Sequence, residues 1–312
     1  MAALMKWLDW YYRVKDGDVY NHPKKQKKEM KNGLVLEGGG MRGMFTAGVM
    51  DAFMEEHLSF NGIIGVSAGA LFGCNYKSEQ PGRALRYNIK LRNDPRYIGW
   101  RPLLKTGNIV SPHFSYHVVP FEIDRFDQET FAKNPTEFWM VCTDIVNGKP
   151  VYHKMDRFTH SEIEWMRASA SMPVVSRPVE IDGKVMLDGG ITDSIPLRAF
   201  QEIGYKRNVV ILTQPKDYYK KPMKINWLIK LLTRKYPMVG ECMAHRHEMY
   251  NRELDYLAEQ EATGNTLLIY PDHTLNIGRT EMNERKMKMV HAMGYEKGSE
   301  VLARVKEFMK GK

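Results

Sequence analysis

A serine flanked by small residues stands at positions 65–69, in the order Gly65-Val66-Ser67-Ala68-Gly69. The apolar pair Ile63-Ile64 precedes it and Ala70-Leu71-Phe72 follows, which is typical of a sharp turn between a strand and a helix. Large side chains have no room at such a turn, and glycine tolerates the dihedral angles that it requires. A serine held in this way can attack a carbonyl carbon, although G-x-S-x-G also occurs in ordinary loops. We therefore expect Ser67 to be a nucleophile if further motifs support it.

A glycine-rich loop precedes this serine along the chain. Residues 33–37 are predicted to form a short buried strand, and a helical pattern through Phe45, Val49 and Phe53 begins after the loop. Consecutive glycines allow backbone amides to approach a ligand closely, and the N-terminus of the helix adds a partial positive charge. Both features stabilise the negative charge that develops on the carbonyl oxygen when a nucleophile attacks. We expect an oxyanion hole here, formed by Gly38, Gly39, Gly40, Met41, Arg42 and Gly43.

The same glycines also satisfy the dinucleotide-binding pattern G-x-G-x-x-G, with Gly38, Gly40 and Gly43 at its three positions. A dinucleotide-binding unit should end its second strand with an acidic residue for the ribose. The next strand here ends instead at Gly65-Val66-Ser67, and Glu55 and Glu56 fall within the intervening helix. The sequence therefore favours the oxyanion interpretation, and we expect no cofactor.

An aspartate ends a predicted hairpin further along the chain. Residues 179–181 and 184–187 flank Asp182-Gly183, which is a strong hairpin signal, and the second strand leads into Asp188. Gly189 and Gly190 follow, so little bulk screens the carboxylate. Pro196 is suited to begin a helix that ends near Gly204. Taken alone, Asp188 could equally hydrogen-bond the backbone of its own turn.

Together and in this order, the three motifs resemble the patatin-like phospholipase family, over residues 33–213. The segment Ala168-Ser169-Ala170-Ser171-Met172-Pro173 is also similar to the approach to the family's aspartate motif. The resemblance implies a nucleophile at Ser67, a direct base at Asp188 with no histidine between them, and amides around Gly39 and Gly40 as the oxyanion hole. It also implies hydrolysis of carboxylic esters of lipids, of the phospholipase A or lysophospholipase type. Gly65, Gly69, Gly189 and Gly190 complete the motifs.

Two other functions remain open at this point. A conventional Ser-Asp-His triad needs a histidine beyond Asp188, and the candidates, none of which sits in a distinctive loop, are His245, His247, His273 and His291. The second open function is that of a membrane-associated scaffold without catalytic turnover, although both reactive side chains, Ser67 and Asp188, are present. The pairs His113/His117 and His245/His247 lack a third ligand at a convincing spacing, so we expect no metal site.

Composition agrees with an intracellular enzyme. The 312 residues can bury a sizeable core, no apolar run reaches the roughly 18 residues that a membrane span needs, and the N-terminus lacks a signal pattern. The three cysteines, Cys74, Cys142 and Cys242, are far apart, which indicates buried thiols rather than a disulfide framework. We expect a cytoplasmic protein.

The net charge of +9 is concentrated in clusters. One cluster spans Lys24–Lys31, and a second runs from Lys216 to Lys235 among Tyr218, Trp227 and several leucines. Basic residues beside aromatic and aliphatic ones at helical spacing suit an anionic membrane surface as well as a helix packed on the core. The aromatic segment 5–12 is equally ambiguous. We expect peripheral contact with the inner face of the membrane, and no nucleic acid partner because no binding motif accompanies the charge.

The remaining pattern predicts a three-layer α/β/α hydrolase core with a mostly parallel or mixed sheet, and a C-terminal helical elaboration. Residues 138–142 and 150–153 form a predicted hairpin through Asn147-Gly148, and Ser161 with Glu164 is the expected capping box of the next helix. Residues 81–92 are a polar stretch. A helix over 241–261, a strand over 266–270 and two helices separated near Gly294 follow. We divide the chain into a 1–32 extension, a 33–213 core and a 214–312 elaboration packed on it.

Overall fold

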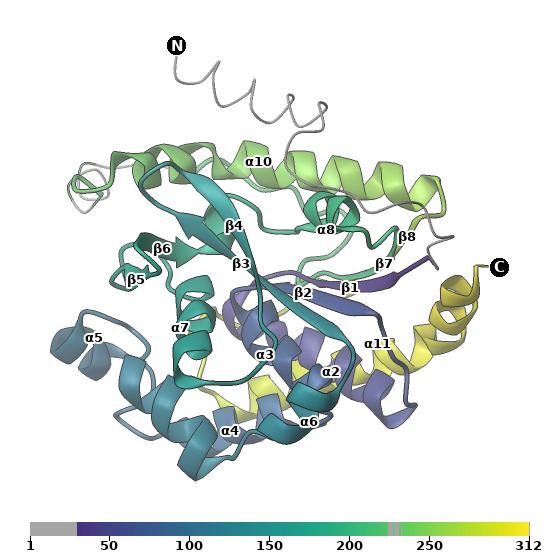
Figure 1. The fold of residues 1–312 in the computed structure, drawn as a ribbon, viewed down its shortest axis with the longest axis horizontal. Helices are drawn as coiled ribbons and strands as arrows, with labels where there is room; N and C mark the ends of the chain where they lie inside the picture. The colour runs from purple at the N-terminus through teal and green to yellow at the C-terminus, as the bar shows by residue number, and fades with distance from the viewer. Residues whose placement is uncertain (1–29, 224–226, 228–230, 232, 312) are drawn as a thin grey trace. The chain divides into compact units, whose positions relative to one another are not determined.

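Strands and helices alternate along the computed structural model of the protein, which describes residues 30–223, 227, 231 and 233–311 (Figure 1). The strands are β1 Asn32–Leu36, β2 Gly62–Val66, β3 Glu137–Asp144, β4 Lys149–Lys154, β5 Val179–Ile181, β6 Lys184–Asp188, β7 Arg207–Ile211 and β8 Thr266–Ile269. The helices are η1 Gly40–Arg42, α2 Gly43–Glu55, α3 Ala68–Lys77, α4 Arg83–Leu91, α5 Trp100–Thr106, η2 Phe114–Ile123, α6 Gln128–Lys133, α7 His160–Ser169, η3 Gly189–Ile191, α8 Leu197–Ile203, α10 Pro237–Ala262 and α11 Glu284–Lys310.

The described strands form one eight-stranded sheet in the order β5-β6-β3-β2-β1-β7-β8, with β4 paired to β3. Strands β3, β2, β1, β7 and β8 run parallel, whereas β4 and β6 are antiparallel to β3 and β5 is antiparallel to β6. Leu36 on β1 is level with Gly65 on β2. The loops that follow these strands therefore leave the same edge of the sheet, where open α/β sheets bind ligands.

Both faces of the sheet are covered by helices. On β1, Leu34 and Leu36 pack in one core with residues of α2, α3 and α11, whereas Val35 packs in a second core with residues of α8 and α10. Figure 1 shows α8 and α10 on one side of the sheet and α2, α3 and α11 on the other. Burial of the parallel strands on both faces explains their continuous apolar sequences. The predicted three-layer α/β/α fold with a mixed, mostly parallel sheet is confirmed.

The C-terminal region contributes to both this sheet and its helical cover. Strand β8 pairs with β7 in parallel, and α11 packs along α2. The division of the chain into segments 1–32, 33–213 and 214–312 stays a prediction, and residues 1–29 lie outside the described part. No helix among the described residues has the length and apolar character needed to cross a bilayer.

The expectation of two helices separated near Gly294 is wrong, because one continuous helix, α11, spans Glu284–Lys310. Gly294 allows this helix to contact α2 directly: a Cβ added there would lie 2.0 Å from the carbonyl oxygen of Phe45. Gly48 on α2 is equally close to the backbone of α11. These glycines therefore serve close helix packing, and the sequence signal of a helix break was misleading.

Replacing Gly294 by alanine is expected to lower the free energy of unfolding by about 1–3 kcal/mol, the usual cost of overpacking. The contact is with backbone atoms, so the added methyl group cannot be accommodated by a side-chain rotation. Urea denaturation followed by circular dichroism measures the change. Gly278→Ala is the matched control, because its added Cβ would have its nearest neighbour at 4.0 Å. Equal stability of the two variants would contradict this view of the helix interface.

Other local expectations have mixed outcomes. The hairpin at Asp182-Gly183 is confirmed, with φ of 50° and 73° at the two turn residues. The expected capping box is wrong by two positions, because Thr159 is the N-cap of α7 and its hydroxyl accepts a hydrogen bond from the Glu162 amide. The polar stretch 81–92 contains α4, which the sequence pattern did not reveal.

Candidate active site

Ser67 lies at the strained turn between β2 and α3. Its φ of 54° and ψ of −121° are rare for a residue other than glycine, and such strain concentrates at functional sites. Gly69 follows in α3, where a Cβ would lie 2.4 Å from the carbonyl oxygen of Leu36. At the end of β2, a Cβ on Gly65 would lie 2.6 Å from the Ala70 amide nitrogen. The small residues of this motif are therefore required by close backbone contacts around the serine.

A buried serine that sequence reasoning passed over fixes this turn. Ser169, at the end of α7, accepts a hydrogen bond from the Ser67 amide at 3.1 Å and donates one to the Val141 carbonyl at 2.7 Å. It therefore ties the turn to β3. The only sequence signal was its position in the segment 168–173, which the family resemblance had marked as an approach to the aspartate motif.

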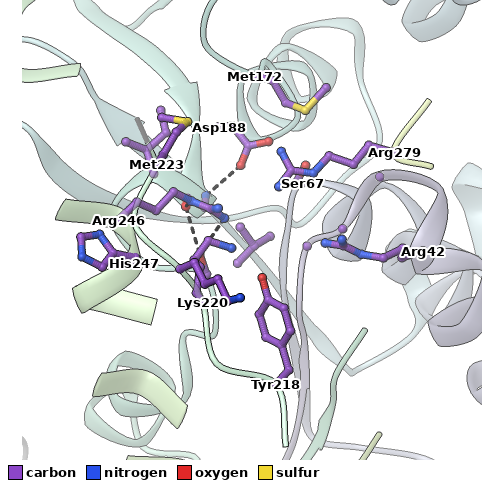
Figure 2. A pocket seen from close by; sticks show the side chains of 18 of the residues that line it. Arg42, Ser67, Met172, Asp188, Tyr218, Lys220, Met223, Arg246, His247 and Arg279 are labelled. Carbon is purple, nitrogen blue, oxygen red and sulfur yellow. Dashed lines mark hydrogen bonds between the residues drawn. The ribbon is translucent and has the colours of Figure 1, made fainter. Parts of the chain in front are cut away.

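Asp188 is buried at the end of β6 and is brought to Ser67 by the sheet. Strand β6 pairs with β3 so that Cys142 is level with Asp188, and β3 lies next to β2, which leads into Ser67. The Gly190 amide donates to Asp188 Oδ1 at 2.8 Å, and Gly189 and Gly190 form the start of η3. Figure 2 shows Ser67 and Asp188 next to each other on one wall of a pocket.

Burial raises the pKa of Asp188 above its ordinary value. The nearby Ser67 side chain and the hydrogen bond from the Gly190 amide act against this increase, as do the positive charges of Arg246 and Arg279. A carboxylate with a raised pKa is a stronger base than a solvated aspartate. The site thus pairs a strained serine hydroxyl with a carboxylate of increased basicity.

The glycine-rich loop runs beside this pair, and its amides divide into two groups. The Met41 amide donates to the Arg279 carbonyl at 3.0 Å, the Arg42 amide donates to Gly39 at 3.3 Å, and the Gly43 amide donates within the same turn. These bonds occupy the amide donors of Met41, Arg42 and Gly43, and the oxyanion hole itself stays a prediction. The amides of Gly38, Gly39 and Gly40 have no acceptor within the described residues.

A second residue missed by sequence reasoning is Glu37, which anchors the start of this loop through hydrogen bonds. Its carboxylate accepts hydrogen bonds from the Thr213 amide at 2.6 Å, the Thr213 hydroxyl at 3.0 Å and the Tyr250 hydroxyl at 2.7 Å. The residue is 2% exposed, and these neighbours supply hydrogen bonds to both of its carboxylate oxygens. Glu37 thereby links the end of β1 to the end of β7 and to α10. The only sequence signal of Glu37 was the presence of a charged residue at the end of a buried strand.

Two cavities meet at Ser67. The larger, of about 1340 Å³, is lined by Asp188, the glycines of the loop and several basic residues. The smaller, of about 140 Å³, is lined mainly by apolar side chains, among them Leu71, Val119 and Met166. Gly40, Ser67, Met172, Arg279 and Thr280 line both. A ligand at Ser67 can therefore place a polar group on one side and an apolar group on the other.

The four histidines proposed for a triad lie in different places. His247 and His273 line the larger cavity, His291 bonds to Asp51 at 2.7 Å, and His245 faces Glu248 at 3.2 Å. In the part of the chain that the structure describes, none of them is hydrogen-bonded to Ser67 or Asp188. The described residues also contain no group of three or more side chains placed to hold a metal ion.

The second basic cluster is irregular before residue 224, whereas Trp227 and Leu231 further along it are helical and exposed. Tyr218, Lys220 and Lys221 line the larger cavity in an irregular segment after β7, and Lys220 lies over the Tyr250 ring at 4.4 Å. Several members of the cluster, including Lys224 and Lys230, and the N-terminal segments 5–12 and 24–28 lie outside the described residues. Contact of these segments with a membrane stays a prediction.

The fold and the strained serine at this sheet edge are typical of α/β serine hydrolases. A sequence model of the patatin-like phospholipases matches residues 34–200, which is more than half of the chain. The chain belongs to the patatin-like phospholipase family, as its motifs predicted. A second model, a domain of unknown function called DUF6363, matches residues 236–310.

The chain is also similar to several individual proteins. The uncharacterized protein YjjU of Escherichia coli is 28% identical over 242 residues, which cover 73% of this chain and 64% of YjjU. Lysophospholipase NTE1 is 27% identical over 207 residues in Cryptococcus neoformans and 29% identical over 191 residues in Debaryomyces hansenii. These matches cover 60% and 57% of this chain but only 12% and 11% of the NTE1 proteins. The crystal structure of VipD from Legionella pneumophila aligns with 88% of this chain and 67% of VipD, at 14% identity and a TM-score of 0.43.

Proposed function

We propose that the protein is a serine acyl hydrolase that cleaves carboxylic esters of lipids, of the phospholipase A or lysophospholipase type. The observation that carries the proposal is that the strained Ser67 and the buried Asp188 line one cavity beside the Gly38, Gly39 and Gly40 amides, which have no acceptor among the described residues. Membership of the patatin-like phospholipase family and similarity to lysophospholipase NTE1 support a lipid ester as substrate.

The reaction follows from the roles of these groups. Ser67 Oγ forms a bond to the ester carbonyl carbon while its proton passes to Asp188, and the amides of Gly38, Gly39 and Gly40 stabilise the oxyanion. The tetrahedral intermediate then expels the alcohol, which takes the proton from Asp188. Water, deprotonated by Asp188, attacks the acyl-serine, and the acid leaves as Ser67 recovers its proton. The two steps release the alcohol and the fatty acid.

The alternatives are less well supported. A Ser-Asp-His triad requires a histidine bonded to the aspartate or the serine, and among the described residues no hydrogen bond joins His245, His247, His273 or His291 to Asp188 or Ser67. A scaffold without turnover has no need of a strained serine paired with a buried carboxylate, because strain costs stability. The geometry therefore favours a dyad of Ser67 and Asp188.

The smaller cavity suits the start of an acyl chain. Its volume of about 140 Å³ is close to that of cavities of roughly 150 Å³ that bind benzene, so it can hold about six carbons of a chain. The chain would enter beside Ser67 and lie against Leu71, Val119 and Met166. Burial of these methylenes contributes about 0.8 kcal/mol each, which favours esters of longer acids over acetate.

The proposal is tested by incubating the purified protein with a lysophospholipid and with a diacyl phospholipid that carries the same headgroup. Mass spectrometry of the lipid extract should find free fatty acid from at least one of them, with the complementary glycerophospho compound or lysophospholipid in equal amount. Fatty acid release from neither lipid, with a carboxylic ester such as p-nitrophenyl hexanoate also left intact, would contradict the proposed function.

A further inference from the structure

Basic side chains from four separate segments converge on the larger cavity. Arg42 comes from η1, Lys220 from the segment after β7, Arg246 from α10 and Arg279 from the loop before α11. Figure 2 shows these four side chains around the space in front of Ser67 and Asp188. Segments far apart in the sequence thus bring like charges together, which is unfavourable unless something of opposite charge balances them.

Acidic residues within the protein balance these charges only in part. Glu37 accepts hydrogen bonds from Thr213 and Tyr250 and acts on Lys220 through its charge, and Asp188 acts in the same way on Arg279. Three acids line the cavity, namely Asp188, Asp217 and Asp272. Asp188 accepts a hydrogen bond from the Gly190 amide, and Asp272 pairs with Lys297 at 2.9 Å. Among the described residues, none of the four basic side chains is within ion-pair distance of a carboxylate.

Two of the four basic groups lie in surroundings that a bound anion would make more favourable. Arg42 Nε is buried without a hydrogen-bond acceptor in the described part of the chain. Burial, and then the charges of Arg246 and Arg279, lowers the pKa of Lys220 to about 7. Arg246 is the exception, because its guanidinium donates to the Gly190 carbonyl and to Ser194 Oγ. A buried donor without an acceptor costs free energy, and a bound anion would remove that cost.

We propose that this cluster is a subsite for the phosphate of an anionic phospholipid headgroup, and that the C-terminal region, including the domain of unknown function, supplies three of its four basic side chains. The inference rests on the proposed function. In a glycerophospholipid the glycerol unit joins the ester carbonyl to the phosphate, so a carbonyl at Ser67 leaves the phosphate in the same cavity. Arg246 and Arg279 lie in the domain that matches residues 236–310, and Lys220 precedes it. The cluster attracts phosphate and repels the quaternary ammonium of a choline headgroup.

Binding is tested in the Ser67→Ala background, where substrate is not consumed and the result does not depend on turnover. The probes are lysophosphatidylglycerol and lysophosphatidylcholine with the same acyl chain, below their micellar concentrations, and inorganic phosphate. We expect the full-length protein to bind lysophosphatidylglycerol about tenfold more tightly than lysophosphatidylcholine, as charge-assisted hydrogen bonds predict. Lys220→Gln and Arg279→Gln should each reduce this preference severalfold, and the double variant should abolish it.

Lys184→Gln is the matched control, because Lys184 is exposed on the hairpin of β5 and β6 and does not line the cavity. Equal binding of the two lipids, or an unchanged preference in the double variant with a preserved circular dichroism spectrum, would overturn the proposal. Competition between inorganic phosphate and lysophosphatidylglycerol would support it. Phosphate binding that depends on the cluster, without any preference between the lipids, would identify a free phosphate ligand and overturn the headgroup assignment. A wild-type protein that hydrolyses no ester would instead contradict the proposed function, and the binding test of the phosphate subsite would still stand.

Discussion

Ser67→Ala should lower kcat/KM for p-nitrophenyl hexanoate by about 10⁴- to 10⁶-fold, as loss of the serine does in other serine hydrolases. Without the hydroxyl no acyl-enzyme can form, and only binding and the oxyanion hole would contribute to the remaining rate. Initial rates under conditions of low substrate measure kcat/KM directly. Ser161→Ala is the control, since Ser161 is exposed on α7. A rate for Ser67→Ala within tenfold of the wild type would reject Ser67 as the nucleophile.

Asp188→Asn should lower kcat/KM by about 10²- to 10⁴-fold, the usual contribution of a general base. The amide keeps the shape of the side chain but cannot take the serine proton. Asp182→Asn is the matched control, because Asp182 is exposed in a hairpin turn that asparagine also favours. Each of His245, His247, His273 and His291 should tolerate alanine, whereas a triad would lose most of its activity at one of them.

The same aspartate determines how the wild-type activity depends on pH. Only the deprotonated carboxylate can act as the base, so activity is full above the pKa of Asp188 and falls as the pH decreases through it. Burial raises this pKa, which moves the acidic limb of the pH profile of kcat/KM above that expected for a solvated aspartate of pKa about 3.9. A profile that stays flat down to pH 4 would contradict this role.

The parts of the site that were predictable from sequence depend on local signals. The flanking glycines of Ser67 are required by contacts with neighbouring backbone, and the Asp182-Gly183 turn sets the register that delivers Asp188. Burial of β1 and its neighbours on both faces produces the continuous apolar strands that predict the three layers. In each case the structural requirement lies within one short segment, so the residue types of that segment predict the structure.

The parts that were not predictable depend on contacts between distant segments. Ser169 and Glu37 act through partners on other elements, and a serine or glutamate has no local pattern that announces such a partner. Gly294 has the sequence signature of a helix break, yet its function is close packing against Phe45. The convergence of Lys220, Arg246 and Arg279 likewise appears only when the C-terminal region is folded onto the sheet.

The central claim is that Ser67 is a nucleophile activated by Asp188. Reaction with a long-chain fluorophosphonate, followed by peptide mapping with mass spectrometry, tests this claim most directly. We predict a single adduct on the peptide that contains Ser67, formed at a rate that falls at least 100-fold in Asp188→Asn and is unchanged in Asp182→Asn. An adduct on a different residue, or labelling of Ser67 at the same rate in Asp188→Asn, would contradict it.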